Sequence, residues 1–244
     1  MRPKFLTDRA ILIEPDRILV LSDLHLGIEK ELAENGITIP SQVEKLKERI
    51  KKMIKENKIK HLIILGDIKH EVKGISYLEY REVPQFFKDL KIKISLIKGN
   101  HDGNIEKLLP KEIDIYDGKG FSIKNFTFTH GHAWPNPDAL DSEYIIMGHM
   151  HPAVEFWTKE FRTVEHCWVK CEVNKKKLEK KYKKKSKLKY GIIMPTFNHL
   201  TGGLAFNSKE FRPKGLAPKI LKWKEGAVYL LDGTFLGKLN EITK

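Results

Sequence analysis

Short apolar runs separated by polar stretches dominate the first 150 residues, and five of these runs end in the same way. Each run has the length and the content of β-branched, Leu or aromatic residues that is typical of a buried strand. Each is followed by Asp, Asn or His. The runs are ILVLS (18–22) before Asp23 and His25, HLIIL (61–65) before Asp67, ISLIK (94–98) before Asn100, His101 and Asp102, FTFT (126–129) before His130 and His132, and YIIM (144–147) before His149 and His151.

The segment between the first two runs predicts a helix. Apolar residues recur at every third or fourth position over 43–57, with Lys and Glu between them, which is typical of an amphipathic helix. Ser41 and Glu44 have the spacing of a capping box at its start, and 29–39 is expected to be a polar loop. A strand–helix–strand unit implies parallel strands joined by a right-handed crossover.

The rest of the chain predicts a second helix and then mostly strands. A helix is expected over 75–90, divided or restarted at Pro84, and a short helix over 104–109. Further short strands are expected at 10–13, 113–116, 121–124, 153–157, 161–173, 192–195, 204–206 and 226–231. This order favours a single α/β domain over 1–244, built as a four-layer α/β/β/α sandwich of two mixed sheets with helices outside.

Composition excludes several classes of protein. No apolar stretch approaches the ~20 residues that span a bilayer, and the N-terminal MRPKFLTDRA lacks the apolar segment of a signal peptide. Two cysteines in 244 residues exclude a disulfide-stabilised scaffold. We therefore expect a cytoplasmic protein without a membrane partner.

One segment supplies most of the formal net charge of +13. Ten lysines and one glutamate lie between Asn174 and Lys189. Strong self-repulsion and few apolar residues predict a solvated loop or hairpin at about 174–189. Such a loop could still neutralise phosphate groups, with Tyr182 or Tyr190 available for stacking on bases.

Seven residues after the apolar runs form a mixed set of oxygen and nitrogen ligands for metal ions. They are Asp23, His25, Asp67, Asn100, His130, His149 and His151. Because ligands in open α/β sheets collect at the carboxyl ends of strands, these side chains are expected to converge. A set without sulfur argues against a structural zinc cage and for Mn first, with Zn, Fe or Ni as alternatives. Seven ligands are too many for one ion with open positions, so two divalent ions are expected. One shared carboxylate suits a two-ion site that activates water for attack on phosphorus.

The ordered series DLH, GD, GNHD, THG and GHMH resembles the calcineurin-like metallophosphoesterase superfamily. The resemblance implies one ion held by Asp23, His25 and His151, a second held by Asn100, His130 and His149, and Asp67 as the bridge between them. It also implies that His101 faces the phosphate as general acid or transition-state donor. Asp102 follows His101 directly and is expected to orient its imidazole.

A narrower resemblance concerns the substrate. GDIKH (66–70) resembles the GDxxH of SbcD-type DNA repair nucleases, in which the equivalent histidine helps to position the scissile phosphate. LHLGIE (24–29) and MPTFNHLTGG (194–203) resemble the archaeal SbcD-related phosphoesterases and the bacterial ligase-associated DNA-damage endonucleases. The resemblance implies His70 as a further catalytic candidate, although a plain loop histidine is the alternative.

Three hypotheses for the function remain. The favoured one is a two-metal phosphodiesterase that acts on DNA or RNA. The alternative keeps the chemistry but acts on small substrates such as cyclic nucleotides or phosphomonoesters. A binding module with a degenerate site is disfavoured, because no ligand position is missing. Endo- or exonuclease action, protein partners and a homo-oligomeric state stay open.

The remaining histidines and the two cysteines have structural interpretations. His132 is expected beside the ligands or at the surface, and Asn198 and His199 are candidates for supporting the site. Cys167 and Cys171 are expected to be buried thiols rather than zinc ligands, because four residues of strand separate them by about 13 Å.

Overall fold

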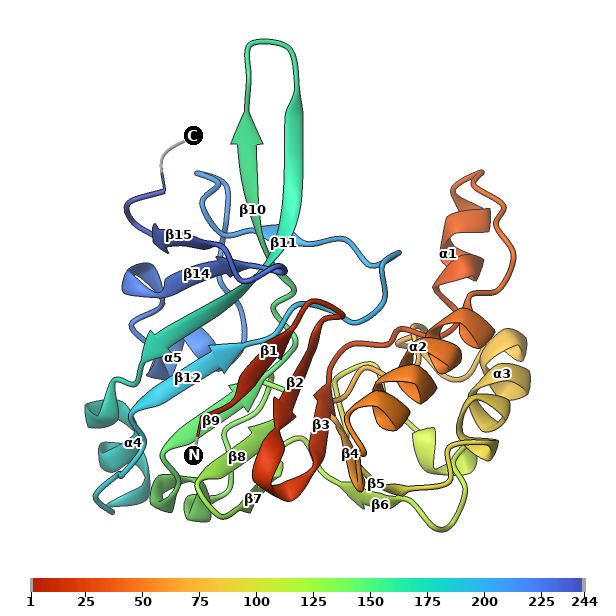
Figure 1. The fold of residues 1–244 in the computed structure, drawn as a ribbon, viewed down its shortest axis with the longest axis horizontal. Helices are drawn as coiled ribbons and strands as arrows, with labels where there is room; N and C mark the ends of the chain where they lie inside the picture. Colours follow the sequence, from red (N-terminus) through yellow and green to blue (C-terminus); the bar gives the residue numbers. More distant parts are fainter. Residues whose placement is uncertain (1, 243–244) are drawn as a thin grey trace.

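Two mixed β-sheets pack face to face, and helices cover both outer surfaces (Figure 1). The computed structural model describes residues 2–242. Its layers run helix, sheet, sheet, helix, which confirms the α/β/β/α fold class predicted from the sequence. Within the described residues, no helix is both long and apolar enough to cross a membrane.

The first sheet has six strands in the order β1-β2-β3-β4-β5-β6. Their bounds are β1 (Lys4–Leu6), β2 (Ala10–Ile13), β3 (Ile18–Leu21), β4 (His61–Ile64), β5 (Lys93–Ile97) and β6 (Asp114–Tyr116). Neighbours from β3 to β6 are parallel, whereas β1, β2 and β3 are antiparallel. Leu21 pairs with Ile64, which pairs with Leu96. The carboxyl ends of β3, β4 and β5 therefore lie side by side at one edge.

The second sheet has nine strands. Its main path is β13-β10-β11-β12-β9-β8-β7, with β14 pairing β11 and β15 pairing β14. Their bounds are β7 (Phe121–Ile123), β8 (Phe126–Thr129), β9 (Tyr144–Met147), β10 (Pro152–Trp157), β11 (Arg162–Glu172), β12 (Tyr190–Ile193), β13 (Leu204–Ala205), β14 (Ala227–Leu230) and β15 (Phe235–Lys238). β8, β9 and β12 are parallel neighbours, so their carboxyl ends also share one edge.

The central core lies between the two sheets. Both sheets contribute fully buried side chains to it, among them Ile11, Ile63, Phe128, Trp168 and Met194. The central strands are buried on both faces, which is why they read as continuous apolar runs rather than alternating ones. Each such side chain contributes ~1.5–3 kcal/mol relative to exposure. The strands that end at the candidate site are therefore firmly anchored.

Five α-helices flank the sheets in the described part of the chain. Their bounds are α1 (Ile28–Glu34), α2 (Val43–Glu56), α3 (Tyr77–Lys88), α4 (Lys175–Tyr182) and α5 (Ala217–Ile220), and single 3₁₀ turns span Glu14–Asp16, Ile105–Lys107, Pro137–Asp141 and Trp223–Glu225. α2 and α3 pack on the first sheet, and α4 and α5 on the second (Figure 1). α2 buries Leu46, Ile50 and Met53, which confirms the predicted amphipathic helix.

A capping box forms at α3 rather than at α2. The Ser76 hydroxyl accepts the N–H of Glu79, and the Glu79 carboxylate accepts the N–H of Ser76. The box predicted for α2 is wrong, because the N-cap there is Gln42, whose N–H donates to the Glu29 carboxylate. The predicted division at Pro84 is also wrong. α3 runs through it, since the carbonyl that loses its donor belongs to an exposed residue one turn earlier.

α1 occupies much of the stretch predicted to be a polar loop. Its buried residues are Ile28 and Glu29, both at its first turn. Lys30 and Glu34 form an i,i+4 ion pair on its surface. The helix projects from the body (Figure 1), so it lacks the apolar stripe by which sequence periodicity reveals helices.

The first half of the lysine-rich segment is helical. α4 is anchored by the fully buried Leu178 and by Tyr182, whose hydroxyl donates to the carbonyl of Pro135. The prediction of a loop or hairpin is therefore wrong for 175–182. A single apolar side chain and one aromatic contact are enough to dock this helix, and neither stands out in a run of lysines.

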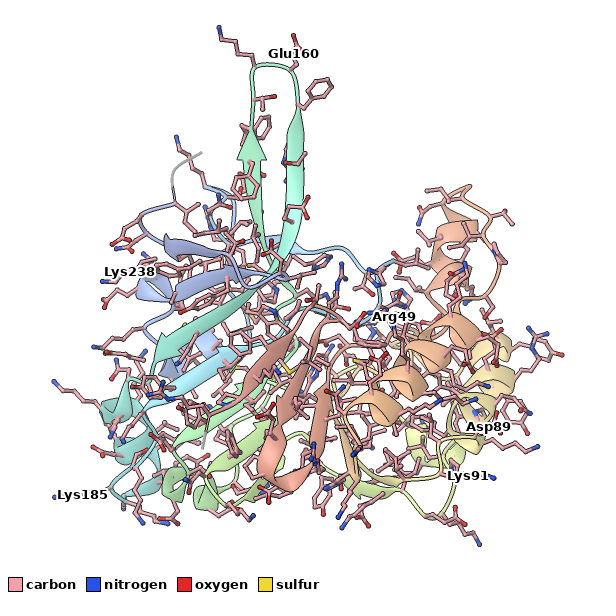
Figure 2. The ribbon with its side chains drawn as sticks, viewed as in Figure 1. Arg49, Asp89, Lys91, Glu160, Lys185 and Lys238 are labelled. Carbon is pink, nitrogen blue, oxygen red and sulfur yellow. The ribbon has the colours of Figure 1, made fainter. Side chains whose placement is uncertain are left out.

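The lysine-rich segment lies at the amino ends of β9 and β12. The N–H of Lys189 donates to the carbonyl of Glu143 at 2.8 Å, and these two residues directly precede the two strands. Figure 2 shows Lys185 at the opposite end of the molecule from Glu160, at the tip of the β10–β11 hairpin. The segment is thus at the edge of the sheet opposite to the candidate ligands.

Candidate metal centre

The five strand ends that carry the candidate ligands meet at one place between the two sheets. On the first sheet, the N–H of Asp23 donates to the carbonyl of Gly66 at 3.1 Å, and that of His25 donates to the carbonyl of Asp67 at 2.8 Å. Across the sheets, the N–H of His149 donates to the Asp23 carboxylate at 3.2 Å. The predicted convergence of the strand ends is therefore confirmed.

Five of the candidate ligands have a left-handed backbone. The φ angles are 57° at Asp23, 42° at His25, 50° at Asp67, 69° at His149 and 42° at His151. Asp23 and His25 therefore do not continue β3 as an extended strand, because both residues lie beyond its end at Leu21 with a left-handed backbone. Such a conformation costs of order 1 kcal/mol per residue and persists only where the surrounding structure enforces it.

Asp23, His25 and His151 form a first group of ligand atoms, all within 4.8 Å of one another. The two Nε2 atoms of the histidines are 3.4 Å apart, and Nε2 of His151 is 3.3 Å from Oδ1 of Asp23. Asp23 is fully buried and His25 is nearly so. These are the residues that the family resemblance assigns to the first ion.

Asp67, His130 and His149 form a second group with the same spread. Nε2 of His130 is 3.4 Å from Oδ2 of Asp67, 3.2 Å from Nδ1 of His149 and 3.2 Å from Oδ1 of Asn100. Oδ2 of Asp67 is also 3.8 Å from Nε2 of His25 in the first group. The Asp67 carboxylate therefore lies between the two groups.

The charges of the two groups favour a bound cation. Burial opposes ionisation of Asp23 and Asp67, but the adjacent imidazoles hold the pKa of each carboxyl below its ordinary value. The same carboxylates overcome burial at His130 and raise its pKa to about 9, so a bound cation would take the place of the proton that they attract. Burial lowers the pKa of His25 to about 3 and that of His149 to about 4, so both stay neutral, as metal binding requires.

Hydrogen bonds fix which ring nitrogen each histidine presents. Nδ1–H of His130 donates to the carbonyl of Leu65 at 2.6 Å, which leaves Nε2 facing Asp67. Nδ1–H of His101 donates to the carbonyl of His70 at 2.5 Å, which leaves its Nε2 facing the same carboxylate at 3.9 Å. Such partners orient metal ligands and set their tautomers.

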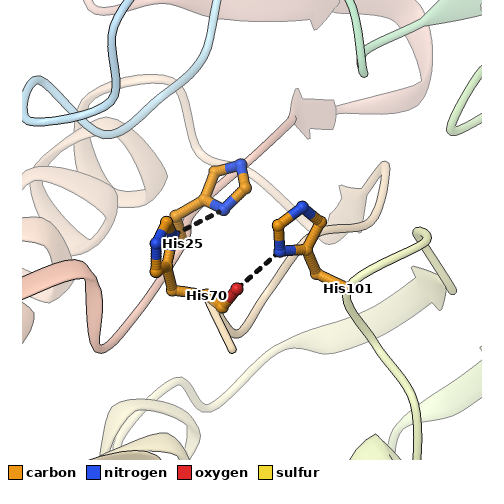
Figure 3. A group of neighbouring side chains, drawn as sticks. All are labelled: His25, His70 and His101. Carbon is orange, nitrogen blue, oxygen red and sulfur yellow. Dashed lines mark hydrogen bonds between the residues drawn. The ribbon is translucent and has the colours of Figure 1, made fainter. Parts of the chain in front are cut away.

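His25, His70 and His101 form a third group at the side of the centre (Figure 3). Nε2–H of His70 donates to the Glu31 carboxylate at 2.5 Å, so its Nδ1 is left as an acceptor. Nδ1–H of His25 lies 3.3 Å from Nδ1 of His70 and donates a hydrogen bond to it. The unprotonated Nε2 of His25 is therefore left to bind an ion. His70 therefore contacts a candidate ligand directly, and α1 supplies its other partner.

Asp102 does not orient His101, so that prediction is wrong. Its buried carboxylate accepts the N–H groups of Ile68 and Gly99, each at 2.8 Å. It ties the turn after β4 to the turn after β5. Burial and the Asp67 charge raise the pKa of Asp102 to about 6, against the opposing effect of these hydrogen bonds.

Two glycines are required by the closeness of the strand ends. Gly66 has a φ of +86°, which glycine adopts without strain. Gly148 has no unusual φ, but a Cβ there would lie 1.7 Å from the hydroxyl of Ser22 and 2.5 Å from Oδ2 of Asp23. At Gly148 glycine is therefore needed for space rather than for its backbone angle.

Several residues that hold the metal ligands in place are not predictable from the sequence, or are only partly so. Ser22 donates to Oδ2 of Asp23 at 2.5 Å, and Thr196 donates to the Asp23 carbonyl at 2.8 Å. The amide of Asn198 donates to the carbonyl of Leu24 at 2.8 Å, which bears out the support role suggested for the MPTFNHLTGG stretch. Ser22 was detectable as the neighbour of Asp23, but Thr196 is brought in by a contact distant in sequence.

The other candidates lie where the sequence places them. The ring of His132 is half-buried, with its centroid 5.2 Å from that of His130 and 6.1 Å from that of His149. Cys167 and Cys171 are free, buried thiols, and burial raises the pKa of Cys171 to about 12. Neither cysteine belongs to a metal-binding group among the described residues.

The donor set fits divalent metal ions. Two buried, ionised carboxylates, an amide oxygen and imidazoles with assigned lone pairs converge within the distances of shared coordination. A cleft of about 220 Å³ opens beside them, lined by His70, His101 and residues of α1. A substrate can therefore approach from the α1 side.

Comparison with known families identifies this arrangement. A family model described as calcineurin-like phosphoesterase matches residues 16–165, more than half of the chain and all the candidate ligands. The chain belongs to the calcineurin-like phosphoesterase family. This confirms the family predicted from the motif series, and membership supports phosphoester hydrolysis with divalent metal ions.

Two solved structures resemble this calcineurin-like phosphoesterase. The crystal structure of Pseudomonas putida nuclease MPE shares 23% identity with a TM-score of 0.61, covering 96% of this chain and 99% of that chain. The phosphoesterase Yfce from E. coli shares 16% identity with a TM-score of 0.43, covering 91% and 97%. At these identities the first likeness shows a common fold. The search of curated protein sequences gave no match.

Proposed function

We propose that this chain is a dinuclear metal-dependent phosphodiesterase whose substrate is a nucleic acid. The observation that carries the proposal is the position of the Asp67 carboxylate between two groups of ligand atoms, with His101 beside it. Asp23, His25 and His151 would hold one ion, and Asn100, His130 and His149 the other. Two ions bound there supply polarisation of a phosphoryl oxygen and activation of water.

The residues of the chain orient the substrate and move the proton. Asn100 is exposed and contributes a neutral oxygen, so it adds no negative charge against an approaching phosphate. His101 is the general acid: its Nδ1–H is fixed by the His70 carbonyl, so a proton on Nε2 points toward the centre for transfer to the leaving oxygen. His70 acts through His25 by holding the tautomer that frees Nε2.

A nucleic acid is favoured over a small diester by two lines of support. The GDIKH, LHLGIE and MPTFNHLTGG motifs resemble those of nucleases in the family. The chain also shares its fold with a nuclease. The alternative, hydrolysis of small diesters such as cyclic nucleotides, is favoured by the cleft beside His101, because three glutamates and only one lysine, Lys30, line it, and this excess of negative charge disfavours a polyanion there. A polynucleotide strand would therefore run outside this cleft, along residues 196–199, whose backbone and side chains contact the Ser22–Leu24 segment of the centre.

The proposal is tested by hydrolysis assays on Mn²⁺-loaded protein. Single-stranded DNA, double-stranded DNA, RNA, a cyclic nucleotide and bis(4-nitrophenyl) phosphate are compared, with chelated protein and Asn100→Ala as blanks. We expect cleavage of at least one polynucleotide that the chelator abolishes. Turnover of the small diesters with no cleavage of any polynucleotide contradicts the nuclease assignment, and turnover that survives chelation contradicts the metal chemistry.

A further inference from the structure

The largest basic segment of the chain lies away from the metal centre. The lysine-rich segment, 174–189, lies at the amino ends of β9 and β12, whereas the metal centre lies beyond the carboxyl ends of the same strands. A nucleic acid substrate needs positive charge near the centre. Two arginines distant in the sequence, Arg9 and Arg49, supply it.

Arg9 and Arg49 converge on one loop that backs the metal centre. Nη1 of Arg9 donates to the carbonyl of Thr196 at 3.3 Å, and Nη1 of Arg49 donates to that of Phe197 at 3.2 Å. The Arg49 guanidinium also stacks on the Phe197 ring, 4.2 Å from its centroid, and Figure 2 labels Arg49, which belongs to α2. A second donor of Arg49 reaches the carbonyl of Asp8.

Residues 196–198 connect these arginines to a candidate metal ligand. The N–H of Phe197 donates to the carbonyl of Ser22 at 2.8 Å, and the hydroxyl of Thr196 donates to the carbonyl of Asp23. The guanidinium groups are therefore separated from the metal centre by one layer of backbone. The next residue of the loop, His199, is exposed beside them.

Neither guanidinium has a carboxylate within 4.0 Å among the residues that the structure describes. Arg9 is buried and its Nε has no hydrogen-bond partner there, and Nδ1 of the neighbouring His166 is likewise buried and unpartnered. Burial and the Arg49 charge lower the pKa of Arg9 to about 10. Glu165 acts on the charge of Arg9, and Asp8 on that of Arg49, from beyond 4.0 Å, which offsets only part of the cost of removing these charges from water. An anion bound from outside would offset that cost.

We propose that Arg49 and His199, with the buried charge of Arg9 beneath them, form a subsite for a non-scissile phosphate of the nucleic acid strand. The proposal rests on the proposed function, because the strand is the one whose scissile phosphate lies at the metal centre. The role is electrostatic, because Nη1 and Nη2 of Arg49 already donate to the carbonyls of Phe197 and Asp8, and its permanent charge is what a phosphate would meet. A small diester has no second phosphate and leaves the subsite empty.

The test compares one charge removed at the subsite with one removed from the lysine-rich segment. Arg49→Gln and Lys185→Gln carry the same charge change, and both positions are labelled in Figure 2. The readout is the ratio of kcat/KM for a single-stranded oligonucleotide to kcat/KM for bis(4-nitrophenyl) phosphate. For Arg49→Gln we expect this ratio to fall about tenfold, with a salt dependence of log(kcat/KM) shallower by about 0.7. Lys185→Gln should leave both the ratio and the salt dependence unchanged.

Arg49→Lys separates charge from structure. It keeps the positive charge but loses the bridge to two carbonyls, so an electrostatic role predicts that it retains most of the ratio. A fall in Arg49→Lys as large as that in Arg49→Gln overturns the proposal, as does an unchanged ratio in Arg49→Gln. If Arg49→Gln fails to fold, the exposed His199→Ala replaces it, with an expected fall of about threefold.

The failure of the subsite and that of the proposed function are distinguishable. Binding of a labelled oligonucleotide in excess chelator is measured by fluorescence anisotropy, which needs no catalysis. Wild-type binding that weakens about tenfold in Arg49→Gln supports the subsite even if no polynucleotide is cleaved. Equal binding by both proteins overturns the subsite even if the protein is a nuclease.

Discussion

Replacement of Gly148 by alanine tests the packing of the two sheets at the metal centre. The added Cβ would lie 1.7 Å from the Ser22 hydroxyl and 2.5 Å from Oδ2 of Asp23. The first contact is about 2 Å shorter than an ordinary van der Waals separation. Both neighbours are fully buried, and Thr196 holds the Asp23 carbonyl, so the overlap cannot be relieved by a side chain turning into solvent.

We expect the overlap to cost about 2 kcal/mol of unfolding free energy, as is typical of overpacking. For a chain of this size that lowers Tm by about 4–8 °C. The Asp23 carboxylate must shift by more than the ~0.5 Å that a preorganised site tolerates, so Mn²⁺ affinity should fall more than tenfold. Thermal unfolding and calorimetric Mn²⁺ titration measure the two effects.

Gly103→Ala is the matched control, because a Cβ at Gly103 meets nothing within 4 Å and the backbone there is unstrained. We expect its Tm to stay near that of the wild type. If Gly148→Ala matches Gly103→Ala in both Tm and Mn²⁺ affinity, the Ser22 and Asp23 side chains do not lie against Gly148. The geometry described for the first group of ligands would then be refuted.

Three further predictions concern individual histidines. His101→Ala should lower kcat by about 10²–10⁴-fold, as for loss of a general acid, with Tm unchanged; activity within tenfold of wild type would exclude that role. His70→Ala should weaken Mn²⁺ binding about tenfold, since it frees the His25 ring, and a titration identical to wild type would count against it. Burial and neighbouring positive charges lower the pKa of His166 to about 4. In the folded protein its pKa lies below the ordinary 6.5, so the stability that neutral His166 confers is present above pH 6.5 and is lost as the pH falls toward 4. Between pH 6.5 and 4 the Tm of His166→Asn should therefore fall less steeply than that of the wild type. Parallel curves of Tm against pH for the two proteins would contradict the assignment.

The strands and the ligand positions were predictable because each depends on local sequence. An apolar run that stops before Asp67 or His149 predicts where a strand ends and shows which side chain follows it. The motif order then fixes the family without knowledge of any distance. What local sequence does not contain is the hydrogen-bonding partner of each side chain.

The errors share that cause. Asp102 follows His101, yet its carboxylate bonds to a turn more than 30 residues away, at Ile68. Gln42 begins α2 because Glu29 reaches it from α1. The role of Arg9 is not predictable from its sequence neighbours, because its link to Asp23 runs through Thr196, more than 180 residues away. Each of these contacts is created by the packing of segments distant along the chain.

The central claim is that two divalent ions bind at the ends of five strands, and the number of bound ions tests it most directly. Metal-free protein is titrated with Mn²⁺ by calorimetry, with elemental analysis of the saturated protein. We expect two ions per chain, and one ion in His130→Ala, which lacks a ligand of the second group only. A stoichiometry of one or none in the wild type, or an undiminished count in His130→Ala, would contradict the account.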